Sequence, residues 1–228
     1  IIQTPELLDL YKSEHLVLVD ASGGKDAKSN YAAKHLDRAL FVDVNTQLAD
    51  IKPDLSQVGR HPLPTLQQFS EVLTTLGITP MSHVVVYDDL LGANAAARFW
   101  WMLKSIGHKA VQVLDGGFQE AVRIGFPTQS GATVPVPATS GYALEKWNLP
   151  LTDLREVEKV SNDKNYRVID VRSRERYDGD TEPIDLIAGH IPGAINIPFT
   201  ENLGANGQFL SPSYLNKKYK ELLRNAGP

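Results

Sequence analysis

The sequence repeats itself at a spacing of 150 residues, and this duplication limits the possible fold more than any other feature. The apolar run that ends at Asp20 has a counterpart that ends at Asp170, and both runs have the pattern of a buried strand. The helical pattern stopped by Gly77 has a counterpart stopped by Gly227, again 150 residues later. Two landmarks in one register predict two copies of the same structural unit in tandem.

Within the first copy, strand patterns alternate with helix patterns. The segment 83–87 is a continuous Val-rich run of the kind buried on both faces of a parallel sheet. Thr65 and Gln68 stand at capping-box spacing before a helix over 65–77. The remaining expectations are helices at 5–13, 93–106 and 117–124, apolar runs at 16–19, 40–44 and 111–114, and a glycine- and lysine-rich loop after Asp20. This alternation predicts an α/β fold in which helices flank a mainly parallel sheet.

The segment 128–150 has a different composition. It carries Pro135, Pro137 and Pro150 among Thr, Ser, Gly and Val, with neither helical nor strand periodicity, which predicts an extended connector. We therefore expect a first domain at 1–127, a linker at 128–150 and a second domain at 151–228. In the second domain the matching elements are a helix at 152–161, a strand at 167–170 and a helix opened by Ser211 and Pro212.

The second copy is shorter than the first. From Gly77 the first copy continues for about 50 residues to Pro127, whereas the sequence ends at Pro228, directly after Gly227. A parallel sheet without its central strand exposes apolar faces and unpaired backbone groups. We therefore expect the sequence to be an incomplete record of a longer protein.

Composition excludes several classes of function. The chain has 23 basic and 27 acidic side chains and no basic cluster, which argues against nucleic-acid and anionic-lipid partners. No stretch reaches the length of roughly 18 apolar residues that a membrane helix needs. Since the chain begins at Ile1 rather than Met, a cleaved leader stays open, and we expect a cytoplasmic location with a periplasmic one as the alternative.

The chain has no cysteine, so the residues shown hold no disulfide, thiolate metal site or cysteine nucleophile. The histidines lack zinc-binding spacing, and we expect no metal site. Gly116 and Gly117 stand outside any phosphate-binding pattern and predict a tight strand-to-helix turn. We expect no cofactor.

Both halves of the chain carry sequence motifs. In the second half the motif is VIDVRSRERY at 168–177, followed by Gly179 and by GHIPGAINIP at 189–198. The first half contributes VLVDAS at 17–22, HVVVYDD at 83–89, RFWWML at 98–103 and VLDGGF at 113–118. These motifs resemble those of rhodanese-like sulfurtransferases, and the resemblance runs through nearly the whole chain. Within this family, the two-domain thiosulfate and 3-mercaptopyruvate sulfurtransferases have the same plan.

The resemblance implies a cysteine persulfide mechanism. A loop cysteine takes the sulfane sulfur of thiosulfate or 3-mercaptopyruvate and passes it to cyanide or a thiol, and backbone N–H groups and a helix N-terminus lower the pKa of the thiol. In such enzymes the second domain holds the cysteine. By the repeat spacing its loop falls about ten residues past Pro228, so we expect the 228-residue chain to be inactive. We expect the protein to be a monomer.

The matching loop of the first half is Asp88-Asp89-Leu90-Leu91-Gly92. Paired carboxylates could serve general acid–base catalysis. Carboxylates would, however, repel the anionic substrates that an N–H cradle attracts, and we favour the interpretation that the first domain is an inactive copy.

Arg172 and Arg176 stand four residues apart after the second-half strand, where arginines can hold a sulfonate or carboxylate. The resemblance implies that Arg176 contacts the substrate, and Arg172 is a second candidate. The alternative is a solvated ion-pair surface with Asp170, Glu175 or Asp185, which would contribute little to stability.

Two neighbouring features refine this interpretation. Mercaptopyruvate-type relatives tend to carry an arginine shortly before the Gly-His, whereas this chain has EPIDLIA at 182–188, which favours thiosulfate as the donor. The resemblance also implies a structural role for His190.

Two other functions stay open: a non-catalytic rhodanese-like module that binds a partner, and a phosphatase-like relative with a longer loop.

Overall fold

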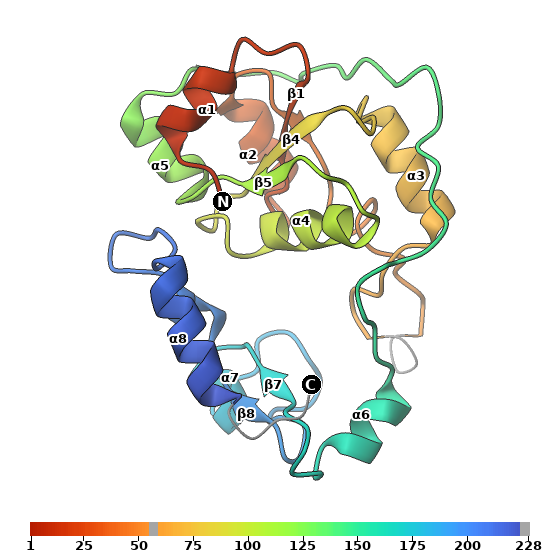
Figure 1. Ribbon diagram of the computed structural model, residues 1–228, viewed down its shortest axis with the longest axis vertical. Helices are drawn as coiled ribbons and strands as arrows, with labels where there is room; N and C mark the ends of the chain where they lie inside the picture. The colour runs from red at the N-terminus through yellow and green to blue at the C-terminus, as the bar shows by residue number, and fades with distance from the viewer. Residues whose placement is uncertain (55–58, 224–228) are drawn as a thin grey trace. The chain divides into compact units, whose positions relative to one another are not determined.

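The computed structural model describes residues 1–54 and 59–223, and the chain divides into two compact units (Figure 1). Unit 1 is Ile1–Leu149 and unit 2 is Pro150–Pro228. The predicted helix stop at Gly227 lies outside the described residues. The predicted α/β class is confirmed, since both units build parallel strand pairs flanked by helices.

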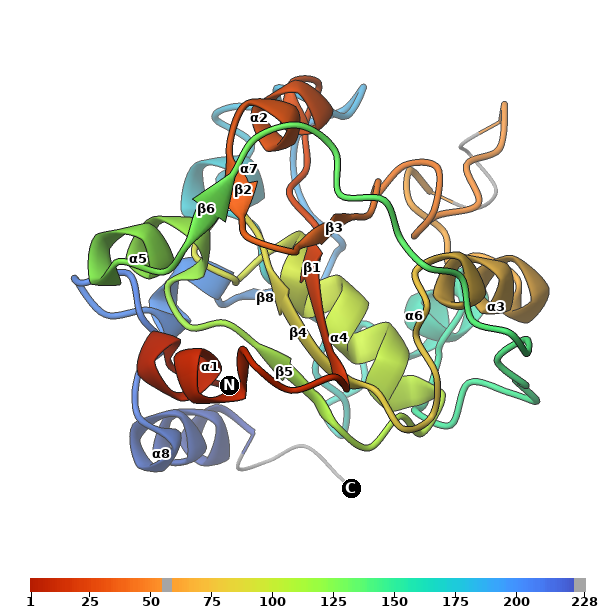
Figure 2. The ribbon, with the colours of Figure 1, turned by 90° about the horizontal axis from the view of Figure 1, so that it is seen from above.

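Unit 1 is built on a four-stranded sheet of order β3-β1-β4-β5, in which every neighbouring pair is parallel. The strands are β1 Leu16–Asp20, β3 Leu40–Phe41, β4 His83–Tyr87 and β5 Val111–Val113. The helices are α1 Thr4–Leu10, α2 Ala27–Ala33, α3 Leu66–Thr75, α4 Ala95–Ser105 and α5 Gly117–Ile124. Figure 2 shows α1 and α5 on one side of the sheet and α3 and α4 on the other.

Valines of β4 form the centre of unit 1, as a strand buried on both faces requires. Val84, Val85 and Val86 are all fully buried. Val85 belongs to the core cluster that includes residues of α1 and α5. On the other face, Phe69 of α3 meets Phe99 of α4 edge to face, with ring centroids 6.1 Å apart. The sheet is therefore covered on both sides.

The capping box predicted for α3 is present. The Thr65 hydroxyl oxygen accepts a hydrogen bond from the Gln68 backbone N–H at 3.2 Å, and Gln68 Oε1 accepts one from the Thr65 backbone N–H at 2.7 Å. These bonds satisfy two donors that a helix start would otherwise leave unpaired.

The segment 21–34, expected to be a loop, contains α2. The local sequence offered little helical signal, because Gly23 and Gly24 precede it and lysines interrupt its apolar pattern. The helix forms because Ala27 and Tyr31 bury one face against the unit. Tertiary packing thus overrides a weak local preference.

Much of the predicted connector packs against unit 1. Its first part forms β6 Thr128–Gln129, which pairs antiparallel with β2 His35–Leu36. Further on, the buried Tyr142 donates its hydroxyl hydrogen to His108 Nδ1 at 2.8 Å, while His108 Nε2 bonds the Ser82 carbonyl at 3.0 Å. Trp147 stacks on Trp101 with centroids 6.2 Å apart. Aromatic side chains therefore hold this proline-rich stretch on the unit.

Unit 2 contains a shorter version of the same plan. Its elements are α6 Leu154–Val160, β7 Ile169–Asp170, α7 Arg174–Asp178, β8 Ile195–Asn196, the 3₁₀ helix η1 Phe199–Asn202 and α8 Pro212–Leu222. The parallel pair β7–β8 aligns Ile169 with Ile195, as β1–β3 aligns Val19 with Leu40. β7 is shorter than the predicted strand, and among the described residues it is hydrogen-bonded to one neighbouring strand, whereas β1 has two.

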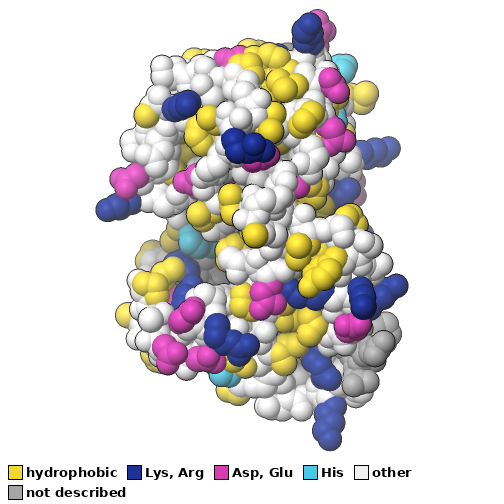
Figure 3. All heavy atoms as spheres, turned by 90° about the vertical axis from the view of Figure 1, so that its left-hand side faces the viewer, with side chains coloured by type: hydrophobic (Ala, Val, Ile, Leu, Met, Phe, Trp, Pro, Cys, Tyr) yellow, Lys and Arg dark blue, Asp and Glu magenta, His cyan; other side chains and the backbone are white. Residues whose placement is uncertain are grey.

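Among residues 1–54 and 59–223, no helix has the length and apolar character needed to cross a bilayer. The face of the molecule in Figure 3 carries basic and acidic side chains interspersed with one another on each unit.

The packing of the connector gives a first prediction. Tyr142→Ala removes a buried ring and its bond to His108, and we expect the free energy of unfolding of unit 1 to fall by about 2–4 kcal/mol. Urea denaturation followed by tryptophan fluorescence measures this, because all three tryptophans lie in unit 1. Tyr166→Ala, at a half-exposed tyrosine in unit 2, is the control. Equal urea unfolding curves for Tyr142→Ala and Tyr166→Ala would contradict the packing role of the connector.

Candidate functional site

The two units share one side-chain arrangement next to their parallel strand pair. In unit 1 the Tyr31 hydroxyl donates to the Ala39 carbonyl at 2.7 Å, and His35 Nδ1 bonds the Tyr31 carbonyl at 2.7 Å. The two rings stack with centroids 3.9 Å apart. We call these contacts the tyrosine–histidine lock. They fix the segment that connects β1 to the parallel strand β3.

Unit 2 repeats the lock with Tyr177, His190 and Ala194. The Tyr177 hydroxyl donates to the Ala194 carbonyl at 2.7 Å, His190 Nδ1 bonds the Tyr177 carbonyl at 2.7 Å, and the rings stack at 3.7 Å. These contacts show His190 fixing the backbone, in agreement with the structural role expected from the sequence.

Each first strand ends in an aspartate that accepts a hydrogen bond from the backbone two residues later. Asp20 accepts from the Ser22 N–H at 2.8 Å, and Asp170 accepts from the Arg172 N–H at 3.0 Å. The surroundings differ. Burial raises the pKa of Asp20, whereas the Arg172 guanidinium lowers the pKa of Asp170. Unit 2 thus places a charged pair where unit 1 has a serine beside a buried carboxyl group.

The sequence between the locked tyrosine and histidine is longer in unit 2. Four positions separate Tyr31 from His35, whereas thirteen separate Tyr177 from His190, so unit 2 has an insertion of nine residues. Glu182 and the neighbouring Asp185 lie in this longer segment. The insertion therefore brings new carboxylates to the strand end.

Glu182 joins both candidate arginines. Its side chain is only 5% exposed, and Arg176 binds it with Nη2 at 2.7 Å from Oε1 and Nε at 3.2 Å from Oε2. Arg172 Nη1 lies 3.3 Å from Oε2. Glu182 also accepts the backbone N–H groups of Ile184 and Asp185, each at 3.0 Å. The carboxylate therefore organises both guanidinium groups and the loop that carries it.

Arg172 also ties the strand end to the turn before His190. Its Nη2 lies 2.6 Å from Asp170 Oδ2 and 2.6 Å from the Gly189 carbonyl oxygen. Arg176 makes a further contact to Asp185, with Nη2 at 3.0 Å from Oδ2. The ion-pair surface considered from the sequence is thus partly present, since Arg172 pairs with Asp170 and Arg176 with Asp185. It is more buried than expected and centres on Glu182, which no sequence motif marks. We call these five side chains, Asp170, Arg172, Arg176, Glu182 and Asp185, the Glu182 cluster.

A cavity of about 570 Å³ opens beside this cluster. Asp170, Arg172 and Asp185 line it, together with the apolar side chains of Val168, Ile169, Val171, Ile187, Ile191 and Ala194. A small anion in such a space would meet the Arg172 guanidinium beside the carboxylates of Asp170 and Asp185, with apolar walls around them. Among the described residues, no group of three or more His, Cys, Asp or Glu has a geometry suited to a metal ion.

The loop after β4 in unit 1 encloses the carboxylate of Asp88. The Asp88 side chain is almost fully buried, and its carboxylate accepts the N–H groups of Leu90, Gly92, Asn94 and Ala96 at 2.7–3.2 Å. We call this set of four N–H groups at the start of α4 the Asp88 cradle.

Close packing shapes the Asp88 cradle. Leu91 and Gly92 both have positive φ, of 64° and 79°, which turns successive N–H groups inward. A Cβ atom on Gly117 would lie 2.5 Å from the Asp88 carbonyl oxygen, so this position accommodates only glycine without a shift of the loop. With its lone pairs taken by four N–H groups, the Asp88 carboxylate is committed to structure rather than to acid–base chemistry.

The matches to known proteins divide between the same two units of the chain. The family model for the rhodanese-like domain matches residues 3–123 and 153–225. The mouse 3-mercaptopyruvate sulfurtransferase is 34% identical over 217 residues, which is 92% of this chain and 71% of the mouse protein. The chicken thiosulfate sulfurtransferase is 33% identical over 198 residues, covering 86% of this chain and 66% of that protein.

A solved structure agrees with these matches. The 3-mercaptopyruvate sulfurtransferase from Leishmania major superposes with a TM-score of 0.77 at 27% identity, covering 98% of this chain and 62% of that one. The chain thus spans less than two thirds of the Leishmania protein and about two thirds of the chicken one.

The Glu182 cluster gives a pH prediction. The Asp185 N–H, the Arg176 guanidinium and the Ile184 N–H together lower the pKa of Glu182 from 4.5 to about 2, against desolvation, which raises it. A depressed pKa stabilises the folded state above pH 4.5, and this contribution is lost as the pH falls toward 2. The lowered pKa of Asp170 acts in the same direction.

We therefore expect unit 2 to lose stability between about pH 5 and pH 2, and Glu182→Gln to be less stable at neutral pH and less sensitive to acid. Amide NMR signals of β7 and β8, followed during denaturation at several pH values, measure this. Glu175→Gln removes an exposed carboxylate from the same region and is the control. Parallel pH profiles for wild type and Glu182→Gln would refute the prediction.

Proposed function

The chain belongs to the rhodanese-like domain family, and we propose that it is a sulfurtransferase chain that moves sulfane sulfur from thiosulfate or 3-mercaptopyruvate to cyanide or a thiol. The observation that carries the proposal is the duplicated strand-end site, in which only the second copy adds two arginines beside a cavity. The curated relatives are sulfurtransferases named for these two donors.

In the proposed reaction, a cysteine thiolate attacks the outer sulfur of thiosulfate. A new S–S bond forms, the original S–S bond breaks, and sulfite leaves with the bonding electron pair. Cyanide then attacks the terminal sulfur of the persulfide, thiocyanate departs, and the thiolate is regenerated with no net oxidation of the protein. With a thiol acceptor, the same step yields an acceptor persulfide.

We place the cysteine beyond Pro228, since residues 1–228 contain none. The Asp88 cradle supports this assignment by analogy. Four N–H groups at a helix start hold a carboxylate in unit 1, and a matching loop in the second copy would hold anionic sulfur and lower the pKa of the thiol. In this scheme domain 1 (1–127) is the inactive copy, 128–150 is the connector, and the domain that begins at 151 carries the site.

The arginines are then the groups that would contact an anionic donor. Arg172 lines the cavity and is held by Asp170 and Gly189, so its guanidinium is already oriented. Arg176 is held by Glu182 and is the residue that the family resemblance implies for substrate contact. Thiosulfate is the favoured donor, because the segment 182–188 offers no additional arginine for a carboxylate.

The first test is the absence of turnover. With no cysteine to form a persulfide, the 228-residue polypeptide incubated with thiosulfate and cyanide should give no thiocyanate above the buffer blank. A longer chain that includes the cysteine loop should form thiocyanate, and its mass should rise by one sulfur atom after incubation with the donor. Turnover by the 228-residue chain would show another sulfur carrier. A longer chain inactive with both donors would refute the proposed function.

The second test concerns Arg176. In a chain that carries the cysteine loop, Arg176→Ala removes a charge-assisted contact that is typically worth about 1.5–3 kcal/mol, so kcat/KM for the donor should fall roughly tenfold to a few hundredfold.

Arg98→Ala is the matched control for this test. Arg98 donates to the carbonyl oxygens of Leu48, His61 and Pro62 in unit 1, and its loss should lower stability without changing donor kinetics of the folded fraction. Equal losses in both variants, after correction for the folded fraction, would assign Arg176 to structure.

A further inference from the structure

The charges of the Glu182 cluster do not favour an anionic donor as they stand. The cluster has three carboxylates, Asp170, Glu182 and Asp185, against two guanidinium groups. A thiosulfate ion that approaches the arginines therefore meets a set with an excess of negative charge. An anion can bind strongly only if one of the carboxylates gives up its arginine contact.

The three carboxylates are held very differently. Asp170 ends a strand and meets Arg172 at 2.6 Å, and Glu182, 5% exposed, binds both arginines and two backbone N–H groups. Asp185 is 46% exposed and lies 3.0 Å from Arg176 Nη2, whereas Arg176 itself is 16% exposed. Water can replace the arginine at a carboxylate as exposed as Asp185, so this contact contributes less than those of the enclosed Glu182. Asp185 is therefore the carboxylate that an incoming anion can displace from its arginine with the smallest loss of free energy.

Asp185 also lies where the exchange would occur. It lines the 570 Å³ cavity beside Arg172. Movement of its side chain toward solvent would free Arg176 Nη2 on the side from which Asp185 binds it, while Glu182 continues to hold Nε. A small oxyanion that takes the place of the Asp185 carboxylate would then contact Arg176 Nη2, and Arg172 lines the same cavity.

We infer that Asp185 is an internal competitor of the sulfur donor: its carboxylate occupies Arg176 in the resting site and is displaced by a small oxyanion of the sulfonate or carboxylate type. Asp185 is a residue that sets donor affinity, and Glu182 is the positioning residue that keeps the guanidinium in place during the exchange. This inference rests on the proposed function for the identity of the anion, but the exchange itself involves only residues of this chain.

Thiosulfate binding to the 228-residue chain tests the exchange without turnover. The Nε–H NMR signals of Arg172 and Arg176 are followed during titration with sodium thiosulfate, at constant ionic strength. Asp185→Asn should bind thiosulfate about fivefold more tightly than wild type, which corresponds to about 1 kcal/mol. Structural damage would weaken binding, so a gain of affinity separates competition from a merely structural role.

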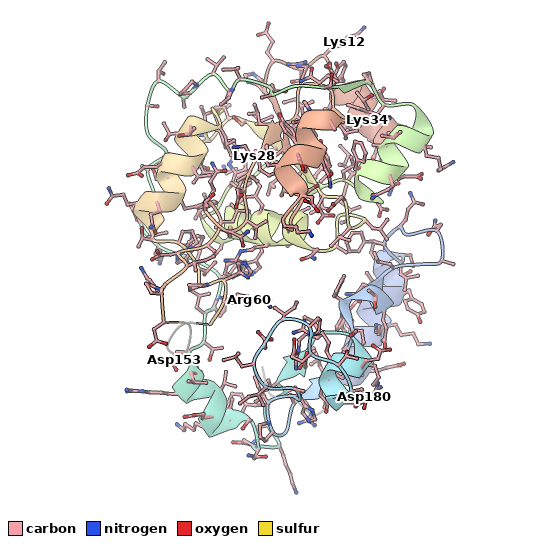
Figure 4. All side chains as sticks on the ribbon, turned by 180° about the vertical axis from the view of Figure 1, so that it is seen from behind. Lys12, Lys28, Lys34, Arg60, Asp153 and Asp180 are labelled. Carbon is pink, nitrogen blue, oxygen red and sulfur yellow. The ribbon has the colours of Figure 1, made fainter. Side chains whose placement is uncertain are left out.

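Asp180→Asn is the matched control. Asp180, labelled in Figure 4 just after α7, is exposed and lies in the same segment, so its substitution removes the same formal charge. The affinity of Asp180→Asn should match that of wild type. Equal gains of thiosulfate affinity in both variants would show that net charge alone causes the effect, and would overturn the inference. An unchanged or weaker affinity of Asp185→Asn, including no binding at all, would overturn it as well.

The two proposals can fail separately. Tighter thiosulfate binding by Asp185→Asn, together with a longer chain that transfers no sulfur, would keep the exchange and reject the sulfurtransferase function. Sulfur transfer by the longer chain, together with unchanged affinity in Asp185→Asn, would keep the function and reject the competitor.

Discussion

The tyrosine–histidine lock is the interaction on which the geometry of both units depends. A parallel strand pair cannot be closed by a tight hairpin, so the chain must leave the first strand, cross over and return in the same direction. In both units the crossover is fixed by a tyrosine hydroxyl on an alanine carbonyl and by a histidine stacked on the tyrosine ring. Because these contacts anchor the two ends of the crossover, the segment between tyrosine and histidine can change in length. Unit 2 uses this freedom to introduce Glu182 and Asp185.

Charged side chains in that inserted segment destabilise the fold unless they are paired. A carboxylate as enclosed as Glu182 is destabilising unless its lone pairs are satisfied, and removal of one partner leaves the other unpaired. The structure meets the condition by supplying two guanidinium groups and two backbone N–H groups to a single side chain. The arginines that would serve a substrate are thereby also needed for the fold of their own loop. Binding and stability are coupled at this place.

The sequence predicted the elements whose signals are local. The Val-rich strand 83–87, the capping box at Thr65 and the register of Asp20 with Asp170 follow from residue pattern alone, and the structure has each of them. It could not reveal α2, whose helix depends on burial of Tyr31, nor the role of Glu182, which depends on how an irregular segment folds back onto Arg172 and Arg176. The substrate role of Arg176 stays a prediction.

The Asp88 cradle also limits how the first unit can change during evolution. No single nucleotide substitution converts an aspartate codon into a cysteine codon, and the intermediates encode glycine or tyrosine. Glycine would leave four inward-facing N–H groups without their anion, and a tyrosine ring would not fit the space that the buried Asp88 side chain fills. Each intermediate is thus less stable than the chain with Asp88. A change from this carboxylate to a thiol therefore has to pass through a destabilised form of the first unit.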